Sequence, residues 1–369
     1  MELSKGKIGI REYVAIVILV VGVKLSDDTP IILAESLNNA YWMAPLIMGF
    51  VSIIPIYLTI KVITAYKNKN LHDVILHLFG KYIGTFLSCV LVLSLMIGLT
   101  FDSAIYVDII GTMYFTQTPY LIIYTVLMAV CAYSAKKGLE HIGTVSWLVL
   151  FYIKLSLLLA LILALKVSNF SFIFPILGPG YLEVIKESTT HLSLFAEIFF
   201  MGLIAPYIVS AKAYKKGTWV AFVIIVIELT ISLLIYLFVF DYEGLKMLDY
   251  PYQELIRLIR LGFLTNIETF FFPFWIIATF IRFTVYVYLI AIFLGGICNI
   301  KNFEYLTPII ATIVVIFGMA PEAPTFTIFK IRELLLNTTS PMFLFVPFLM
   351  WILAKLRGDL KNETTSQNN

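Results

Sequence analysis

The stretch VGVKLSDDTP, residues 21–30, interrupts a segment that otherwise has the composition of a membrane-spanning helix. Residues 13–22, YVAIVILVVG, which overlap its start, are apolar, and the ten residues after it, IILAESLNNA, resemble a continuation. Between them, Lys24, Asp27, Asp28 and Pro30 place three charges and a helix breaker at the expected depth of a bilayer. Non-helical backbone is tolerated there only where it is buried in protein or lines a cavity. The interruption therefore predicts a broken helix that builds a ligand pocket.

The composition assigns the chain to the polytopic membrane proteins. Of its 369 residues, 60% are hydrophobic and only 13% are charged, too few polar residues to cover a soluble domain of this size. No small-residue cleavage site follows the first apolar run, so we expect that run to remain in the protein. The three cysteines have no paired spacing, which predicts neither a disulfide framework nor a metal site.

Ten hydrophobic segments of spanning length follow one another along the chain. We place them at residues 11–39 (interrupted), 43–63, 85–113, 119–135, 143–166, 190–209, 218–240, 265–297, 304–320 and 340–356. Most of the 26 lysines and arginines lie in loops on one side, which is also the side of both termini. The positive-inside rule therefore predicts a multi-pass protein with cytoplasmic termini. The polar tail, 357–369, is expected to be disordered.

Ionisable residues remain at membrane depth in six of these spans. They are Lys24, Asp27 and Asp28 in span 1, Asp102 in span 3, Lys154 in span 5, Glu197 in span 6, Glu228 in span 7 and Arg282 in span 8. Each costs about 2.5–3.5 kcal/mol at a helix centre on insertion scales, so we expect most of them to face a bundle interior or an aqueous cavity. For Glu228, which has no polar neighbour in register, we expect protonated packing instead. The alternative for the set is that the charges pair with one another and only hold helices together.

Span 6, HLSLFAEIFFMGLIAPYIVS, is interrupted as well, because Glu197, Gly202 and Pro206 lie within it. Broken spans in corresponding positions of two halves are the best sequence pointer to a central binding site. Since each half has five spans, the second half is inverted relative to the first. The sequence thus predicts one all-α transporter-like domain over 1–356, a 5+5 inverted repeat with halves at about 11–166 and 190–356 and with broken helices 1 and 6.

Polar and aromatic residues share one face of each of two further spans. In span 8, Trp275, Thr279 and Arg282 are spaced four and three residues apart, and in span 3, Asp102 and Tyr106 are four apart. An aromatic-lined apolar cavity with a few polar groups suits a small amphipathic ligand.

We expect Glu197 to hold an ammonium group of that ligand and Arg282 to receive its carboxylate. The alternative is that Arg282 pairs permanently with Asp102 or Glu197. No P-loop, zinc-binding His-Glu-x-x-His or nucleophilic serine motif occurs. We therefore expect no enzyme activity, catalytic residue, cofactor or nucleic-acid partner.

Three stretches carry a family resemblance: FIFPILGPG (172–180), LFAEIFFMGLIAPYI (194–208) and YPYQELIRLIRLGFLTNIETFFFPFWIIATFIRFTVYVY (250–288). Together they resemble the endospore germination permease family, the B subunit of spore germinant receptors, a branch of the amino acid–polyamine–organocation transporters. The resemblance implies a subunit that binds a small nutrient germinant, such as an amino acid, and triggers germination. It also implies an A-type membrane subunit and a C-type lipoprotein as partners, in the spore inner membrane. The alternative is a proton-coupled amino-acid secondary transporter, because the fold permits both.

By the same resemblance, Lys154 would stand where sodium-coupled relatives hold a cation between spans 1, 5 and 8. Its ammonium would bond the carbonyls freed at Gly22 and Val23, with Asp27 as a further partner. The alternative is a fixed pair of Lys154 with Asp27 or Asp28. The expected ion- or proton-coupling residues are Lys154, Lys24 and Asp28. The expected ligand-binding residues are Gly22, Val23, Asp27, Asp102, Tyr106, Glu197, Gly202, Trp275, Thr279 and Arg282.

An amphipathic outer segment precedes span 8 and carries Tyr250, Pro251, Arg257 and Arg260. Its two arginines are three residues apart. We expect this segment to close the pocket or to contact a partner subunit.

Overall fold

The computed structural model describes residues 6–66, 68–260, 267–320 and 324–362, and within these ranges every named element is helical. The extended pairing in them is an isolated bridge between Ile8 and Ile208. In the part of the chain that the structure describes, six helices are long and apolar enough to cross a membrane, and three shorter apolar helices accompany them. The chain is thus an all-α multi-pass membrane protein, as predicted.

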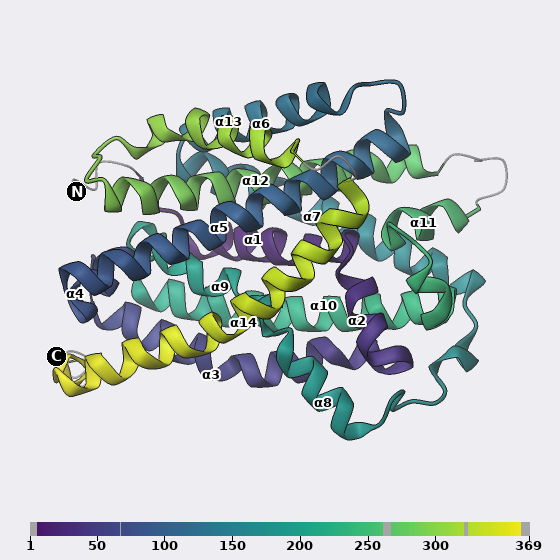
Figure 1. The fold of residues 1–369 in the computed structure, drawn as a ribbon, viewed down its shortest axis with the longest axis horizontal. Coiled ribbons are helices and arrows are strands. Elements are labelled where there is room, and N and C mark those ends of the chain that lie inside the picture. The colour runs from purple at the N-terminus through teal and green to yellow at the C-terminus, as the bar shows by residue number, and fades with distance from the viewer. Residues whose placement is uncertain (1–5, 67, 261–266, 321–323, 363–369) are drawn as a thin grey trace.

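The α-helices follow one another in the order shown in Figure 1. They are α1 (Ile10–Gly22), α2 (Thr29–Leu37), α3 (Ala44–Ala65), α4 (Leu71–Phe79), α5 (Lys81–Ile109), α6 (Tyr120–Lys136), α7 (Leu139–Ala164), α8 (Tyr181–Thr190), α9 (Glu197–Phe200), α10 (Ala211–Lys246), α11 (Pro251–Leu258), α12 (Glu268–Ile297), α13 (Thr307–Gly318) and α14 (Pro324–Leu356). Each of the ten predicted spans falls on helical segments. The number of membrane crossings and the inverted relation of the two halves stay predictions.

Helices α1 and α12 form the centre of the bundle. Both are apolar around most of their circumference, and nearly every residue from Tyr13 to Gly22 is buried. A helix that is hydrophobic all round is stable only when other helices surround it. Helices α10, α7 and α12 pack against α1, while α3, α5 and α7 expose large apolar side chains such as Phe50 and Phe151. These outer faces suit contact with lipid.

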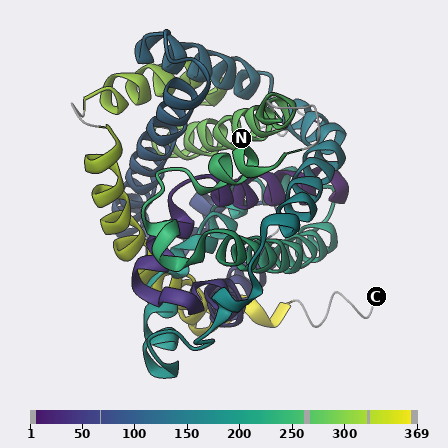
Figure 2. The same cartoon turned by 90° about the vertical axis from the view of Figure 1, so that its right-hand side faces the viewer.

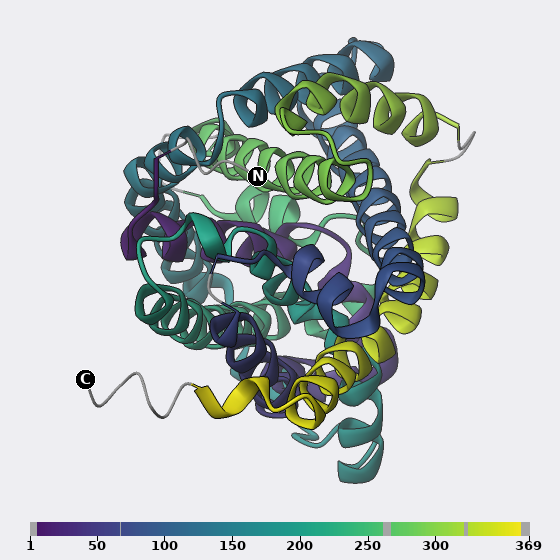
Figure 3. The same cartoon turned by 90° about the vertical axis from the view of Figure 1, so that its left-hand side faces the viewer.

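The described ends of the chain lie at the same end of the bundle, close to α4 (Figures 1 and 3). There, the Ile8 amide donates to the Tyr207 carbonyl at 2.9 Å, and the Tyr66 hydroxyl donates to Asp359 at 2.7 Å. We call this the terminal end. Helices α2, α8 and α11 lie at the opposite end (Figure 2). Within the predicted tail, a short helix covers Asp359–Asn362, and residues 363–369 lie outside the described ranges.

Both predicted interruptions occur. Helix α1 ends at Gly22, a 3-10 turn (η1) covers Val23–Ser26, and α2 begins at Thr29 with Pro30 in its first turn, where the missing proline N–H is not needed. Span 6 is more fragmented than predicted. It consists of the single turn of α9 between 3-10 turns, of which η6 (Leu192–Phe195) precedes α9 and η7 (Met201–Leu203) and η8 (Ala205–Tyr207) follow it.

Candidate functional site

The two interrupted spans meet at a buried ion pair. The Lys24 ammonium, in η1, lies 2.6 Å from Oε1 and 2.7 Å from Oε2 of Glu197, in α9. It also donates to the Leu194 carbonyl at 2.9 Å, which the short turns of span 6 leave accessible. The two side chains are only 4% and 7% exposed. The breaks in spans 1 and 6 are therefore joined by charge and by hydrogen bonds to the same ammonium group.

Helix α12 completes this polar cluster from the other side. The Tyr286 hydroxyl donates to Glu197 Oε1 at 2.6 Å, and Arg282 donates to the Asp102 carboxylate. The Arg282 guanidinium also lies 4.0 Å from Glu197 Oε1. Two buried cations thus face two buried anions, and the pairing of Arg282 with Asp102 that we held as an alternative is present. We define Lys24, Asp102, Glu197, Arg282 and Tyr286 as the central cluster.

Side-chain hydroxyls donate hydrogen bonds to the backbone carbonyls that the break in span 1 leaves without helical partners. The Tyr106 and Ser26 hydroxyls donate to the Val23 carbonyl at 2.8 and 2.7 Å, and the Tyr236 hydroxyl donates to the Leu25 carbonyl at 3.1 Å. Such bonds are required because a buried carbonyl without a donor is unfavourable.

Two residues of α12 that we predicted to bind the ligand already have partners within the protein. The ring of Trp275 stacks on that of Tyr106, with centroids 5.6 Å apart. The Thr279 hydroxyl donates to the Trp275 carbonyl of its own helix at 3.0 Å, so a ligand would have to compete for it.

A second lysine–glutamate pair lies beside the break. The Lys154 ammonium, in α7, donates to Glu228 Oε1, in α10, at 2.5 Å. A Cβ atom at Gly22 would lie 2.9 Å from that oxygen and 3.1 Å from the ammonium, so a larger residue at position 22 would displace the ends of these two side chains. The structure thus differs from the predicted hydrogen bonds of Lys154 to the Gly22 and Val23 carbonyls, and Glu228, expected to pack as an isolated acid, is its partner.

The remaining predicted residues are placed apart from the central cluster or at its edge. Asp27 accepts the Thr29 amide at 2.9 Å and so caps the start of α2, and Asp28, which precedes α2, is buried as well. Gly202 lies toward the terminal end, where a Cβ atom would contact Ile63 and Leu71 at 3.4 Å. Gly202 is therefore not brought together with the other predicted ligand contacts. Within the described residues, no three metal-ligating side chains lie together.

A small cavity of about 80 Å³ adjoins the central cluster. Lys24, Asp102, Glu197 and Tyr286 line it, together with residues of α14. Ligand pockets usually measure about 300–1,000 Å³, and a water molecule occupies about 30 Å³ of liquid. The cavity therefore has room for a few waters, and an amino acid would enter only if the surrounding helices moved.

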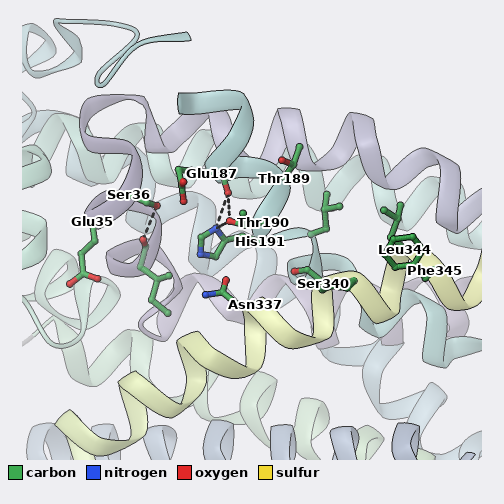
Figure 4. A pocket seen from close by; sticks show the side chains of 13 residues that line it. Glu35, Ser36, Glu187, Thr189, Thr190, His191, Asn337, Ser340, Leu344 and Phe345 are labelled. Atoms are coloured by element: carbon green, nitrogen blue, oxygen red, sulfur yellow. Dashed lines mark hydrogen bonds between the residues drawn. The ribbon is translucent and has the colours of Figure 1, made fainter. Parts of the chain in front are cut away.

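A much larger cavity, of about 610 Å³, lies toward the opposite end between α2, α8 and α14 (Figure 4). Glu35, Thr189, His191 and Asn337 are among the polar residues that line it. Residues on α8 and α14 were missed from the sequence, because periodicity alone does not indicate which faces of distant helices enclose a space.

A hydrogen-bonded contact between η6 and α14 forms a wall common to the two cavities. The Ser193 amide donates to the Ser340 hydroxyl at 3.0 Å, and the Ser193 hydroxyl donates to the Leu336 carbonyl at 2.9 Å. Ser193 and Leu336 line the small cavity, whereas Ser340 lines the large one. This contact therefore lies between the two cavities.

Helix α11 packs against η1, and its own residues Tyr252, Gln253 and Leu255 are buried. Outside, Arg257 donates to Glu268 at 2.9 Å and to Glu254 at 3.3 Å. Burial lowers the pKa of the Arg257 guanidinium, but the hydrogen bond and charge of Glu268 outweigh burial, so its pKa lies above the ordinary value. The predicted outer segment is thus packed on the bundle up to the end of α11.

Three comparisons with known proteins bear on this geometry. A family model described as "Spore germination protein" matches residues 10–327. Spore germination protein YndE of Bacillus subtilis (strain 168) is 21% identical over 251 residues, which are 67% of this chain and 69% of that protein. Spore germination protein B2 of the same organism is 22% identical over 231 residues, 62% of each chain, so the match spans less than two thirds of that relative.

The fold is similar to that of a solved transporter. Mhp1, a nucleobase-cation-symport-1 family transporter in a closed conformation with bromovinylhydantoin bound, matches with a TM-score of 0.63. The match covers 92% of this chain and 75% of Mhp1 at 13% sequence identity. At this identity, the likeness establishes a shared fold alone.

Proposed function

This chain belongs to the spore germination protein family, and from that membership we propose that it is the membrane-embedded B subunit of a germinant receptor. It binds a small nutrient germinant at the central cluster and passes the signal to an A-type membrane subunit and a C-type lipoprotein. We place it in the spore inner membrane with the terminal end in the cytoplasm, because the basic loops and both termini share that side.

The Lys24–Glu197 pair is the observation that carries this proposal. It links the two interrupted spans, so any ligand group that replaces Lys24 at Glu197 changes how span 1 is held against span 6. The two cations and two anions of the central cluster balance. A ligand with a net charge would leave a buried charge uncompensated, whereas a zwitterion such as an amino acid keeps the balance.

A zwitterion also finds donors and an acceptor in the central cluster. Its ammonium can take the place of the Lys24 ammonium at Glu197. Its carboxylate can accept from Arg282, whose Nε and Nη1 atoms have no hydrogen-bond partner among the described residues. Binding then favours a conformation in which the Lys24–Glu197 pair is opened, and the difference in affinity between the two conformations is what a receptor needs.

We propose that the germinant enters the large cavity first and reaches the central cluster from there. It is wide enough for a small ligand and shares a wall with the small cavity. Entry requires that the contacts of Ser193 with Ser340 and Leu336 break, which couples arrival of the ligand to a movement of η6 against α14.

A proton-coupled amino-acid transporter is the second candidate. The observation that favours it is the Lys154–Glu228 pair, which joins spans 5 and 7 beside the break in a chain with a symporter fold. In this candidate, a change of charge on Lys154 breaks its pair with Glu228 and lets spans 5 and 7 separate beside the break in span 1 during each transport cycle.

The test uses spores that lack the gene, with and without a restored copy. Each of the twenty L-amino acids is supplied singly, and germination is followed by the fall in optical density. We expect the deletion to abolish the response to one or a few of them and the restored copy to recover it. An unchanged response to every amino acid, together with uptake of labelled amino acid by liposomes that contain the chain alone, would favour the transporter instead.

A further inference from the structure

A cavity at the terminal end is separate from both cavities described above. It measures about 280 Å³ and lies between the segment before α1, the end of α3 with the residues that follow it, and the stretch from η8 to the start of α10. Lys7 and Lys69 line it, and the described residues of its wall include no aspartate or glutamate. The structure shows no carboxylate within ion-pair distance of either lysine in the described ranges. The described side chains that line the cavity therefore carry positive charge and no negative charge.

The start of α10 adds to this positive potential. Among the first N–H groups of the helix, which have no intrahelical acceptor, that of Ala213 is capped by the Ser210 hydroxyl at 3.1 Å. Ser210 and Ala211 line the cavity. The N-terminus of a helix of 36 residues carries a partial positive charge that favours anions.

An independent observation also indicates a ligand. Tyr214 lines the cavity, its side chain is only 1% exposed, and its hydroxyl has no hydrogen-bond partner among the described residues. The neighbouring Tyr13 is different, because its hydroxyl is bonded to Thr218 at 2.8 Å. A buried hydroxyl without a partner is unfavourable. The hydroxyl is itself almost inaccessible, so a ligand in the cavity supplies an acceptor to it after a small movement of the Tyr214 side chain.

The rest of the wall is apolar and includes Ile63, Pro206 and Val209. An occupant must therefore combine an anionic group with an apolar part. The volume corresponds to about nine water molecules, enough for a phosphate and the glycerol attached to it. Basic pockets between transmembrane helices on the cytoplasmic side are typical sites for anionic lipid headgroups.

We propose that this cavity binds the phosphate of an anionic phospholipid of the leaflet at the terminal end. Lys7 and Lys69 pair with the phosphate, the Tyr214 hydroxyl donates to one of its oxygens, and the glycerol lies on the apolar wall. A bound lipid then holds the segment before α1 against the start of α10, two elements next to the interrupted spans.

The test uses the full chain in nanodiscs of phosphatidylcholine alone or with phosphatidylglycerol. We expect phosphatidylglycerol to raise the melting temperature. In detergent titrations, Lys7→Gln and Lys69→Gln should each weaken the apparent affinity of the chain for phosphatidylglycerol about fivefold, since a basic residue near an anionic lipid contributes about that factor. Tyr214→Phe should weaken the affinity for phosphatidylglycerol by a similar factor while keeping the wild-type melting temperature in phosphatidylcholine, because the hydroxyl has no partner to lose among the described residues.

Lys186→Gln is the matched control, since Lys186 is an exposed lysine on α8 at the opposite end. It should leave the response to phosphatidylglycerol unchanged. If it weakens that response as much as Lys69→Gln does, or if Tyr214→Phe responds fully, the proposed site is refuted. Sodium phosphate added to phosphatidylcholine nanodiscs distinguishes the source of the anion. If inorganic phosphate raises the melting temperature as much as phosphatidylglycerol does, and Tyr214→Phe abolishes this rise, the site binds free phosphate and the proposal of a lipid is wrong.

Discussion

Two lysine–glutamate pairs flank the break in span 1, and they differ in burial and in the number of their partners. The Lys24–Glu197 side chains are 4% and 7% exposed, and each member has further hydrogen bonds, from Lys24 to the Leu194 carbonyl and from Tyr286 to Glu197. The Lys154–Glu228 side chains are 25% and 11% exposed and share a single hydrogen bond.

This difference separates a pair that is costly to open without a replacement partner from one that opens more readily. Breaking a fully buried pair leaves an uncompensated charge, so in our proposal Lys24–Glu197 opens when a ligand replaces one partner. A partly exposed pair loses less, because solvent screens the charge that remains. The Lys154–Glu228 pair is therefore the better candidate for a charge change that accompanies ligand binding.

The largest expected effect follows from removal of the Lys24 ammonium. Lys24→Met leaves Glu197 buried with Tyr286 as its remaining close donor, which should destabilise the fold by about 3–5 kcal/mol. Lys154→Met should cost clearly less. Thermal unfolding of both variants of the full chain in detergent checks the order, and equal losses would remove the distinction between the two pairs.

A smaller loss is expected for Tyr286→Phe, which removes one hydrogen bond to the charged Glu197. Bonds to charged groups contribute about 1.5–3 kcal/mol. Tyr236→Phe is the matched control, because it removes a bond of the same hydroxyl type to the neutral Leu25 carbonyl, for about 1 kcal/mol. Melting temperatures of the two variants give the comparison. A loss in Tyr236→Phe that matches or exceeds that in Tyr286→Phe would argue against a charged acceptor in the central cluster.

Lys154→Gln should destabilise the chain by roughly 1–2 kcal/mol, between the values for exposed and buried pairs. Because glutamine cannot change charge, the variant should also flatten the pH dependence of the germination response. The measurement is the amino-acid dose–response of spores at several pH values with the protein level held constant. A variant that accumulates normally and keeps the full pH profile contradicts a coupling role for this lysine.

The smallest effect is expected for Gly22→Ala. Alanine favours the helix by about 0.5–1 kcal/mol over glycine, but its Cβ would displace Glu228 and Lys154, and overpacking costs about 1–3 kcal/mol. The net loss should be about 1 kcal/mol and should be non-additive with Lys154→Gln. Additivity with Lys154→Gln, measured by thermal unfolding, would show that Gly22 does not act through this pair.

The sequence was sufficient to predict the two breaks, because charges and prolines within an apolar run conflict with a continuous span. Pro30 and Pro206 both lie where helices are interrupted. The extent of the break in span 6 was not predictable, since short 3-10 turns have the same apolar composition as an α-helix.

The pairing of the buried charges was only partly predictable. Their depth and the inward face of α12 follow from spacing, and Arg282–Asp102 was among the alternatives. The partners of Lys24 and Lys154 lie 173 and 74 residues away, and only the packing of separate spans brings them together. Glu228 was misjudged for this reason, since its register within span 7 carries no information on the position of span 5.

The germination dose–response of Glu197→Gln tests the central claim most directly. Glutamine keeps the size of the side chain but removes the charge that we propose for the ligand's ammonium group. With the amino acid that gives the strongest response in the panel, and at equal protein level, the half-maximal concentration should rise about tenfold or more, as expected for a lost charged contact of about 1.4 kcal/mol. Glu228→Gln, the same change in the other pair, should shift it by less than about threefold at neutral pH. An unchanged curve for Glu197→Gln, or equal shifts in the two variants, would contradict a germinant site at the central cluster.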